Sequence, residues 1–190
     1  LFNNAVYAKQ LTTIEKINII LEKIDVERNL YGDATDESIQ ELEELISKVQ
    51  VSSELTRGYG QWHDLGKGWK ARVDRPTSGA GQAKPHVHVR KGGTEGVESV
   101  DGSKSHGQTL GQAGVPKDIQ KKARNLNDYK KGQKDLANMK KAKSQMNAKG
   151  LNLRKAAHIV IAIGIFIAVV GFAIFATSAV SAWGAFLLLI

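Results

Sequence analysis

KPHVHVRKGGTEGVESVDGSKSHG, residues 84–107, decides what kind of domain the middle of the chain forms. Apolar and polar residues alternate at its start, and the turn sequences KGG (91–93) and DG (101–102) interrupt it. Alternation with a period of two between glycine-rich turns is typical of short antiparallel strands. We therefore predict a small β-rich module, with further strand patterns at 69–73 and 97–100.

This stretch also carries three of the chain's five histidines. Because residues i and i+2 of a strand share a face, His86 and His88 should point the same way, with Val87 and Val89 turned to the core. Arg90 continues the histidine row. The strand thus predicts a cationic, imidazole-bearing strip on one face of the sheet.

Two imidazoles beside cations suit phosphodiester chemistry. One ring takes the proton of a 2′-hydroxyl, a second protonates the leaving oxygen, and Lys or Arg neutralises the phosphorane. The candidate catalytic residues are His86, His88, His106 and Asp101, the last two returning to the same face after the next strand. This hypothesis makes the chain a metal-independent ribonuclease that needs no cofactor.

Two alternatives stay open for the same residues. His-x-His can supply two ligands to zinc, with His106, His63 or Asp101 as the third. An exposed strand can also carry the same spacing without any chemistry. The chain has no cysteine, which excludes disulfides and thiolate chemistry.

Charge divides the chain into three unlike parts. Residues 1–60 carry six Lys/Arg against eleven Asp/Glu, residues 61–155 carry twenty-one against eight, and residues 156–190 carry no charged side chain. Such asymmetry indicates separate parts with separate surroundings.

The acidic front, residues 1–55, has apolar residues at helical spacing on both sides of Gly32. That glycine is a helix stop, and Thr35 or Asp36 is the next N-cap. We predict a helical hairpin that needs a third surface, since two helices alone form a thin core. A partner, the residues before the hairpin or the middle module would supply that surface.

Residues 115–153, after the β-rich module (56–114), predict a basic amphipathic helix. Pro116 suits its first position, and Gly132 is a candidate break. Its cations would draw polyanions, either RNA or anionic lipid. The candidate phosphate or lipid headgroup contacts are Lys84, Arg90, Lys121, Lys122, Arg124, Lys130 and Lys131.

The apolar tail, residues 154–190, predicts a transmembrane segment, because a bilayer core needs about 20 apolar residues in a helix. A single span over 157–176 is favoured over a short hairpin of two arms. Lys149 and Lys155 would hold its start on the cytoplasmic side, and Trp183 would suit the other interface.

The runs WKARVDRP (69–76), KPHVHV (84–89), VDGSKSHG (100–107) and PKDIQKKA (116–123) resemble small domains at the C-terminal ends of bacterial polymorphic toxins. The resemblance covers about residues 62–127. It implies a toxic domain, often a nuclease, behind a helical delivery part, and a cognate immunity protein as partner. The positions it carries over are Trp69, Arg72, His86, His88, Asp101 and His106.

The sequence therefore predicts an α+β chain with an N-terminal helical hairpin, a small antiparallel β-module with a basic helix, and a C-terminal transmembrane helix. The predicted function is that of a membrane-anchored, toxin-type protein acting on RNA. A membrane-inserting, depolarising toxin and a non-catalytic tethered binding module are the alternatives.

Overall fold

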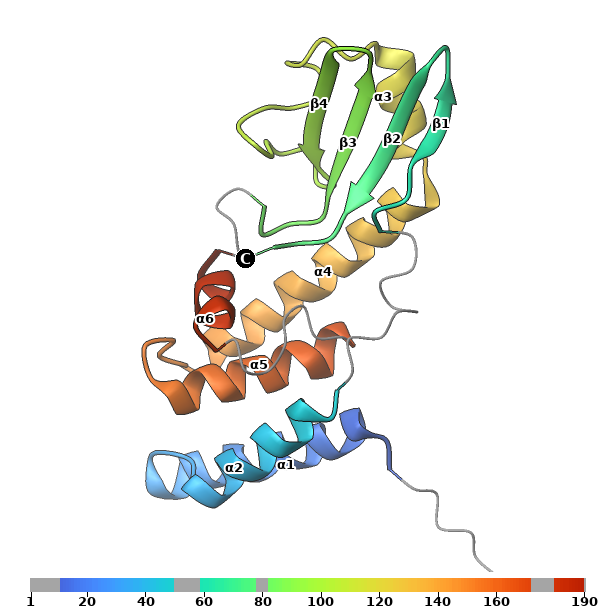
Figure 1. Cartoon of the computed structure of the whole chain (residues 1–190). Coiled ribbons are helices and arrows are strands. Elements are labelled where there is room, and N and C mark those ends of the chain that lie inside the picture. The colour runs from blue at the N-terminus through green and yellow to red at the C-terminus, as the bar shows by residue number, and fades with distance from the viewer. Residues whose placement is uncertain (1–10, 50–58, 78–81, 172–179, 190) are drawn as a thin grey trace, which may run out of the picture.

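The computed structural model describes residues 11–49, 59–77, 82–171 and 180–189. Within these residues the chain is α+β, with a four-stranded antiparallel sheet at one end and a group of helices at the other (Figure 1). The long helix α4 (Asn127–Ala148) runs from one to the other. The predicted α+β class is therefore confirmed, and the predicted transmembrane part is not.

The N-terminal hairpin forms as predicted over its described residues. Helix α1 (Thr13–Tyr31) ends where Gly32 adopts a left-handed φ of 85°, and α2 (Asp36–Ser47) begins after the N-cap Thr35. Glu27 accepts hydrogen bonds from the Thr35 backbone and from the Ser38 hydroxyl at 2.9 and 2.7 Å, which fixes the link between the helices. Residues 1–10 and 50–55 of the predicted hairpin lie outside the described residues.

The sheet has the strand order β1-β2-β3-β4. Its strands are β1 (His63–Gly66), β2 (Trp69–Asp74), β3 (His86–Lys91) and β4 (Thr94–Ser99). Strands β2 and β3 follow the predicted alternation, whereas β4 buries its last four residues in a row. Strand β1 was missed, because it is four residues long and buries only one side chain, so it shows no readable period.

Alternation gives the sheet two unlike faces. One face packs against α3 (Lys117–Arg124) and α4 and forms a core with the following buried residues: Trp69, Ala71, Val73, Val87, Val89, Val100, Ile119, Ala123 and Leu136. The other face carries the polar residues between them. His86 and His88 therefore lie opposite the helices.

The basic region forms two helices where we predicted one with a candidate break at Gly132. The break falls at Asn125–Leu126, between α3 and α4, and Pro116 is the N-cap of α3, not its first residue. Gly132 instead lies inside α4, where an added Cβ would stand 3.0 Å from Val100. Its missing side chain lets the helix lie close to the sheet.

The predicted transmembrane helix is wrong. Helix α5 (Ala156–Val170) has 15 residues and ends at Gly171, which adopts a left-handed φ of 88°. Helix α6 (Val180–Leu189) follows, and residues 172–176 of the predicted span lie outside the described residues. No helix in the described parts of the chain combines the length and the apolar character needed to cross a bilayer. The expected single-pass membrane location, with its basic side cytoplasmic, is overturned by the same finding.

Helix α5 is apolar on every face because protein surrounds it. It packs against α1, α2, α4 and α6, and so it is the third surface that the hairpin needs. An added Cβ on Gly164 would lie 3.1 Å from Leu42 and 3.3 Å from Leu21, so the helices approach closely there. A helix apolar all round is either membrane-spanning or a core helix, and α5 is the latter.

The residues that we expected at the two membrane interfaces have other roles. Trp183 is fully buried, with its ring edge-on to Phe166 at 5.3 Å between centroids. Lys149 pairs with Asp25 and Lys155 with Asp33, so both lysines fasten the α1–α2 hairpin to the region around α5.

Candidate active site

Strand β3 places two imidazoles side by side on the face opposite the helices. Val87 and Val89 are fully buried in the core, which turns His86 and His88 to the other side, as predicted. Their ring centroids lie 5.2 Å apart. The pleat alone accounts for this arrangement.

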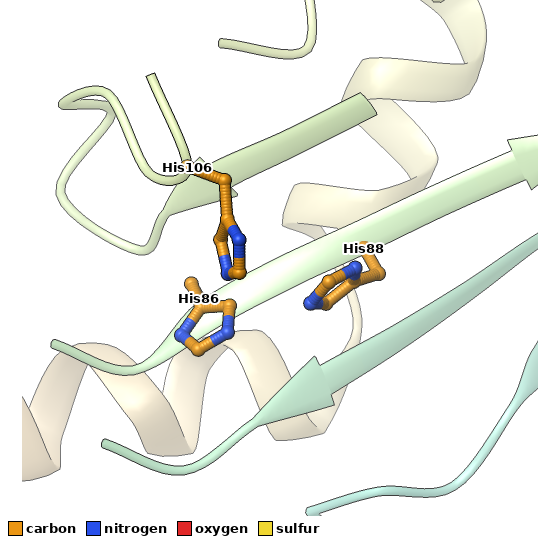
Figure 2. A group of neighbouring side chains, drawn as sticks. All are labelled: His86, His88 and His106. Atoms are coloured by element: carbon orange, nitrogen blue, oxygen red, sulfur yellow. The ribbon is translucent and has the colours of Figure 1, made fainter. Parts of the chain in front are cut away.

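A third imidazole reaches the pair from a tight turn (Figure 2). Ser105 and Gln108 exchange backbone hydrogen bonds of 3.0 and 3.1 Å, and both central residues have positive φ, 51° at His106 and 82° at Gly107. This is the pattern of a type I′ turn, in which Asn or Gly is preferred at the first central position. The His106 ring lies 5.3 Å from that of His86 and 5.5 Å from that of His88.

His86 is the buried member of the group, with 3% of its surface exposed. Its Nδ1 donates a hydrogen bond to the backbone carbonyl of Lys84 at 2.9 Å, because a carbonyl can only accept. Burial lowers the pKa of His86, against the opposing effect of this hydrogen bond. The ring is therefore neutral near pH 7, and its Nε2 carries a free lone pair.

His88 has carboxylates at both ring nitrogens. Nδ1 lies 2.9 Å from Glu95 and Nε2 lies 3.4 Å from Asp74. Asp74 also accepts a hydrogen bond from Arg72 at 2.7 Å. The two carboxylates lie on opposite sides of the ring and so orient it.

One ligand atom from each of His86, His88 and His106 lies within 4.8 Å of the others. Zinc binds imidazole nitrogen at about 2.0–2.1 Å, so small side-chain movements would let all three ligate one ion. The backbone carbonyl behind His86 and the carboxylate beside His88 are the outer partners that metal-binding histidines use. Of the third ligands we considered, His63 is absent from the group, because it pairs with Asp128 at 2.6 Å.

Asp101 does not contact the three rings. It accepts hydrogen bonds from Ser103 at 2.6 Å and from Lys84 at 2.9 Å. Burial opposes the ionised form, but these hydrogen bonds outweigh burial and lower the pKa of Asp101 to about 2. Because the carbonyl of Lys84 holds His86, the aspartate acts on the site through Lys84 and is a positioning residue.

Most of the predicted anion-binding cations have structural partners. Lys122 donates to the Leu65 carbonyl at 2.7 Å, and Lys131 pairs with Asp135 at 2.7 Å. Arg124 forms two 2.9 Å hydrogen bonds with the buried Glu98. Lys121 and Lys130 are exposed. The α3–α4 surface is thus less available to polyanions than its sequence indicates.

Two further positions from the toxin resemblance lie on opposite faces. Trp69 is part of the core, whereas Arg72 lies on the histidine face as the register partner of His88. Sequence reasoning missed Asp74, Glu95 and Trp62. Strand pairing brings the first two beside His88, and the segment before β1 brings Trp62 to the histidine face. The alternation at 69–74 does place Asp74 on the polar side, and that was the available signal.

Comparison with known proteins leaves the site to be interpreted from its own geometry. No protein-family model, curated protein or solved structure matches the chain.

Proposed function

We propose that the sheet and its histidine group cleave RNA by acid–base catalysis, without a metal ion. The observation that supports this function is the convergence of His86, His88 and His106 within 4.8 Å. A general acid or base must lie about 2.6–3.2 Å from the atom whose proton it moves. A single phosphodiester group placed among the rings is within reach of two of them.

His86 is the general base. Its Nδ1 proton is held by the Lys84 carbonyl, and burial keeps the ring neutral, so Nε2 is the atom that accepts a proton. It removes the proton of the ribose 2′-hydroxyl. The 2′-oxygen then attacks the adjacent phosphorus, and a bond from phosphorus to the 2′-oxygen forms.

His88 is the general acid. Glu95 fixes its Nδ1 side. Nε2 lies 3.4 Å from Asp74, and the departing 5′-oxygen replaces that carboxylate as its partner, so Nε2 delivers a proton to this oxygen as the bond from phosphorus to it breaks. The products are a 2′,3′-cyclic phosphate and a 5′-hydroxyl. His106 is exposed beside the other two rings, where its imidazole donates a hydrogen bond to the phosphorane.

Two imidazoles in unlike surroundings are what this reaction requires, since one must start without its second proton and the other with it. His86 is buried and bonded to a backbone carbonyl, and His88 lies between carboxylates. This contrast supports the two roles.

A toxin-type role with a cognate immunity protein extends the proposal and rests on the motif resemblance alone. A binding module without catalysis is the competing function. It predicts RNA binding without cleavage and no dependence of any activity on the two histidines of β3.

The test uses the purified full chain with a single-stranded RNA oligonucleotide. Cleavage should produce a 2′,3′-cyclic phosphate, should persist in EDTA, and should be lost in His86→Asn and His88→Asn. Asparagine keeps a donor near the Nδ1 position and lacks the second ring nitrogen. His63→Gln is the matched control, because His63 pairs with Asp128 outside the group. Binding without cleavage would overturn the proposal.

A further inference from the structure

Trp62 and Arg90 form a stacked pair on the histidine face of the sheet. The Arg90 guanidinium carbon lies 3.9 Å from the centroid of the Trp62 ring, and that of Arg72 lies 4.8 Å from it. Arg90 follows His88 by two residues on β3, and Arg72 is the register partner of His88 on β2. Two strands and the segment before β1 therefore bring an indole and two guanidinium groups beside the catalytic rings.

The charge of Arg90 is not neutralised by an ion pair. No carboxylate among the described residues pairs with it, and Glu95, opposite Arg90 in the β3–β4 register, contacts His88 instead. The side chain is exposed. Arg72 is only partly satisfied, because its buried Nε has no acceptor among the described residues. Arg72 also forms a 2.7 Å ion pair with Asp74, so Arg90 is the guanidinium group whose charge is left for an anion.

In another cation–aromatic pair of the chain, an ion pair neutralises the cation. Lys131 lies 4.3 Å from the Tyr59 ring centroid, but it also forms a 2.7 Å ion pair with Asp135. That pair joins parts of the core and has its charge compensated. The Trp62–Arg90 pair has no such partner and lies at the surface.

Guanidinium groups stack on aromatic rings, and a stacked guanidinium presents a planar cationic surface on its open side. Nucleobases stack on aromatic rings and on arginine planes, and phosphates bind to the same cations. Two residues along a strand correspond to about 7 Å, so this surface lies close to the rings that act on the phosphodiester.

We propose that Trp62 and Arg90 form a subsite that stacks the nucleobase next to the cleaved phosphodiester, which makes single-stranded RNA the substrate. The inference builds on the proposed RNA cleavage and names its substrate class. A base within a duplex is already stacked on both sides, whereas an unpaired base is free to enter the subsite.

The test measures binding without requiring catalysis. The full chain is titrated into a fluorescein-labelled oligouridine made entirely of 2′-O-methyl nucleotides, which lacks the attacking hydroxyl. Trp62→Ala and Arg90→Lys should each weaken binding about tenfold or more, as expected for the loss of one base–aromatic stack. Arg90→Lys keeps the charge and removes the plane.

The control is Lys70→Ala, since Lys70 is an exposed cation opposite Arg90 in the β2–β3 register. It should change binding less than either stacking variant. Trp62→Phe, which keeps an aromatic ring, should bind better than Trp62→Ala and covers the case in which the alanine variant fails to fold. An oligonucleotide with an abasic residue should bind wild type more weakly and should show no further loss with Arg90→Lys.

If Arg90→Lys bound with wild-type affinity, or if the abasic residue did not weaken binding by the wild type, the subsite would be overturned. Charge attraction alone would then explain the binding. A wild-type chain that does not bind the oligonucleotide would overturn it as well. A wild type that binds in this pattern but leaves the all-ribose oligonucleotide intact would support the subsite and refute only the cleavage reaction.

Discussion

The rings of His86 and His106 lie 5.3 Å apart, although one belongs to a central strand and the other to a surface turn. The first is buried and fixed by a backbone carbonyl, and the second is exposed on a two-residue turn with positive φ. Asn or Gly would suit that turn better than His. We interpret a histidine in this turn, with its ring beside those of His86 and His88, as a residue whose side chain contributes to the proposed site.

Removal of the proposed base should abolish catalysis while preserving the fold. We expect His86→Asn to lower kcat/KM for RNA cleavage about 10²- to 10⁴-fold, the range for loss of a general acid or base. The amide still donates to the Lys84 carbonyl, so thermal unfolding should shift by only a few degrees. Activity within threefold of wild type would rule out His86 as the base.

The pH dependence of cleavage should show the lowered pKa of His86. The active form is the neutral ring, so kcat/KM rises with pH as this residue loses its proton. Because burial lowers its pKa, the midpoint of the acidic limb should fall below about 6.5, the ordinary value for histidine. A midpoint above that value in a pH–rate profile would contradict the assigned role.

Zinc should inhibit the reaction that the three imidazoles perform. Their ligand atoms lie within 4.8 Å of one another, so an added ion would occupy the lone pair that His86 needs. We expect inhibition at near-stoichiometric zinc, reversal by EDTA, and no inhibition of His106→Asn at the same concentration. Activity that disappears in EDTA and returns with zinc would instead identify a metal-dependent enzyme.

Asp101 should contribute stability that depends on pH. Hydrogen bonds lower its pKa from 3.8 to about 2, so the folded state favours the ionised form. This contribution is present above about pH 4 and is lost as pH falls toward 2. After allowance for solvent screening, Asp101→Asn should cost about 1 kcal/mol at pH 7 and close to nothing at pH 2.

Urea unfolding of both proteins at the two pH values measures this difference. An equal cost at pH 7 and pH 2 would show that the carboxylate charge is not responsible. The variant should keep most of its RNA cleavage activity, since Asp101 reaches His86 only through Lys84.

The elements that the sequence predicted well are those whose signals are local. The hairpin follows from Gly32 and Thr35, and the shared face of His86 and His88 follows from the alternation of one strand. The return of His106 was also expected. The first two inferences required only the chain within a few residues of the feature, and the third followed from the turn sequences on both sides of β4.

The tail shows where local signals fail. An apolar helix has the same sequence signature whether lipid or protein surrounds it. Only the packing of α1, α2 and α4 around α5, and the helix end at Gly171, distinguish the two cases. The packing depends on contacts between distant segments, which periodicity does not encode, whereas the end at Gly171 is a local signal like that at Gly32.

The residues around the site could not be predicted from the sequence for a similar reason. Asp74, Glu95 and Trp62 lie on other segments than His88, and their proximity depends on strand register and on the position of β1. Asp101 was expected among the rings but pairs with Lys84.

The most direct test of the central claim uses a DNA oligonucleotide that contains one ribonucleotide. The full chain should cut it only on the 3′ side of that residue and leave a 2′,3′-cyclic phosphate, which mass spectrometry identifies. The all-DNA oligonucleotide should stay intact, as should the chimeric one treated with His86→Asn. Cleavage of the all-DNA strand, or equal cleavage by wild type and His86→Asn, would contradict acid–base catalysis at this histidine group.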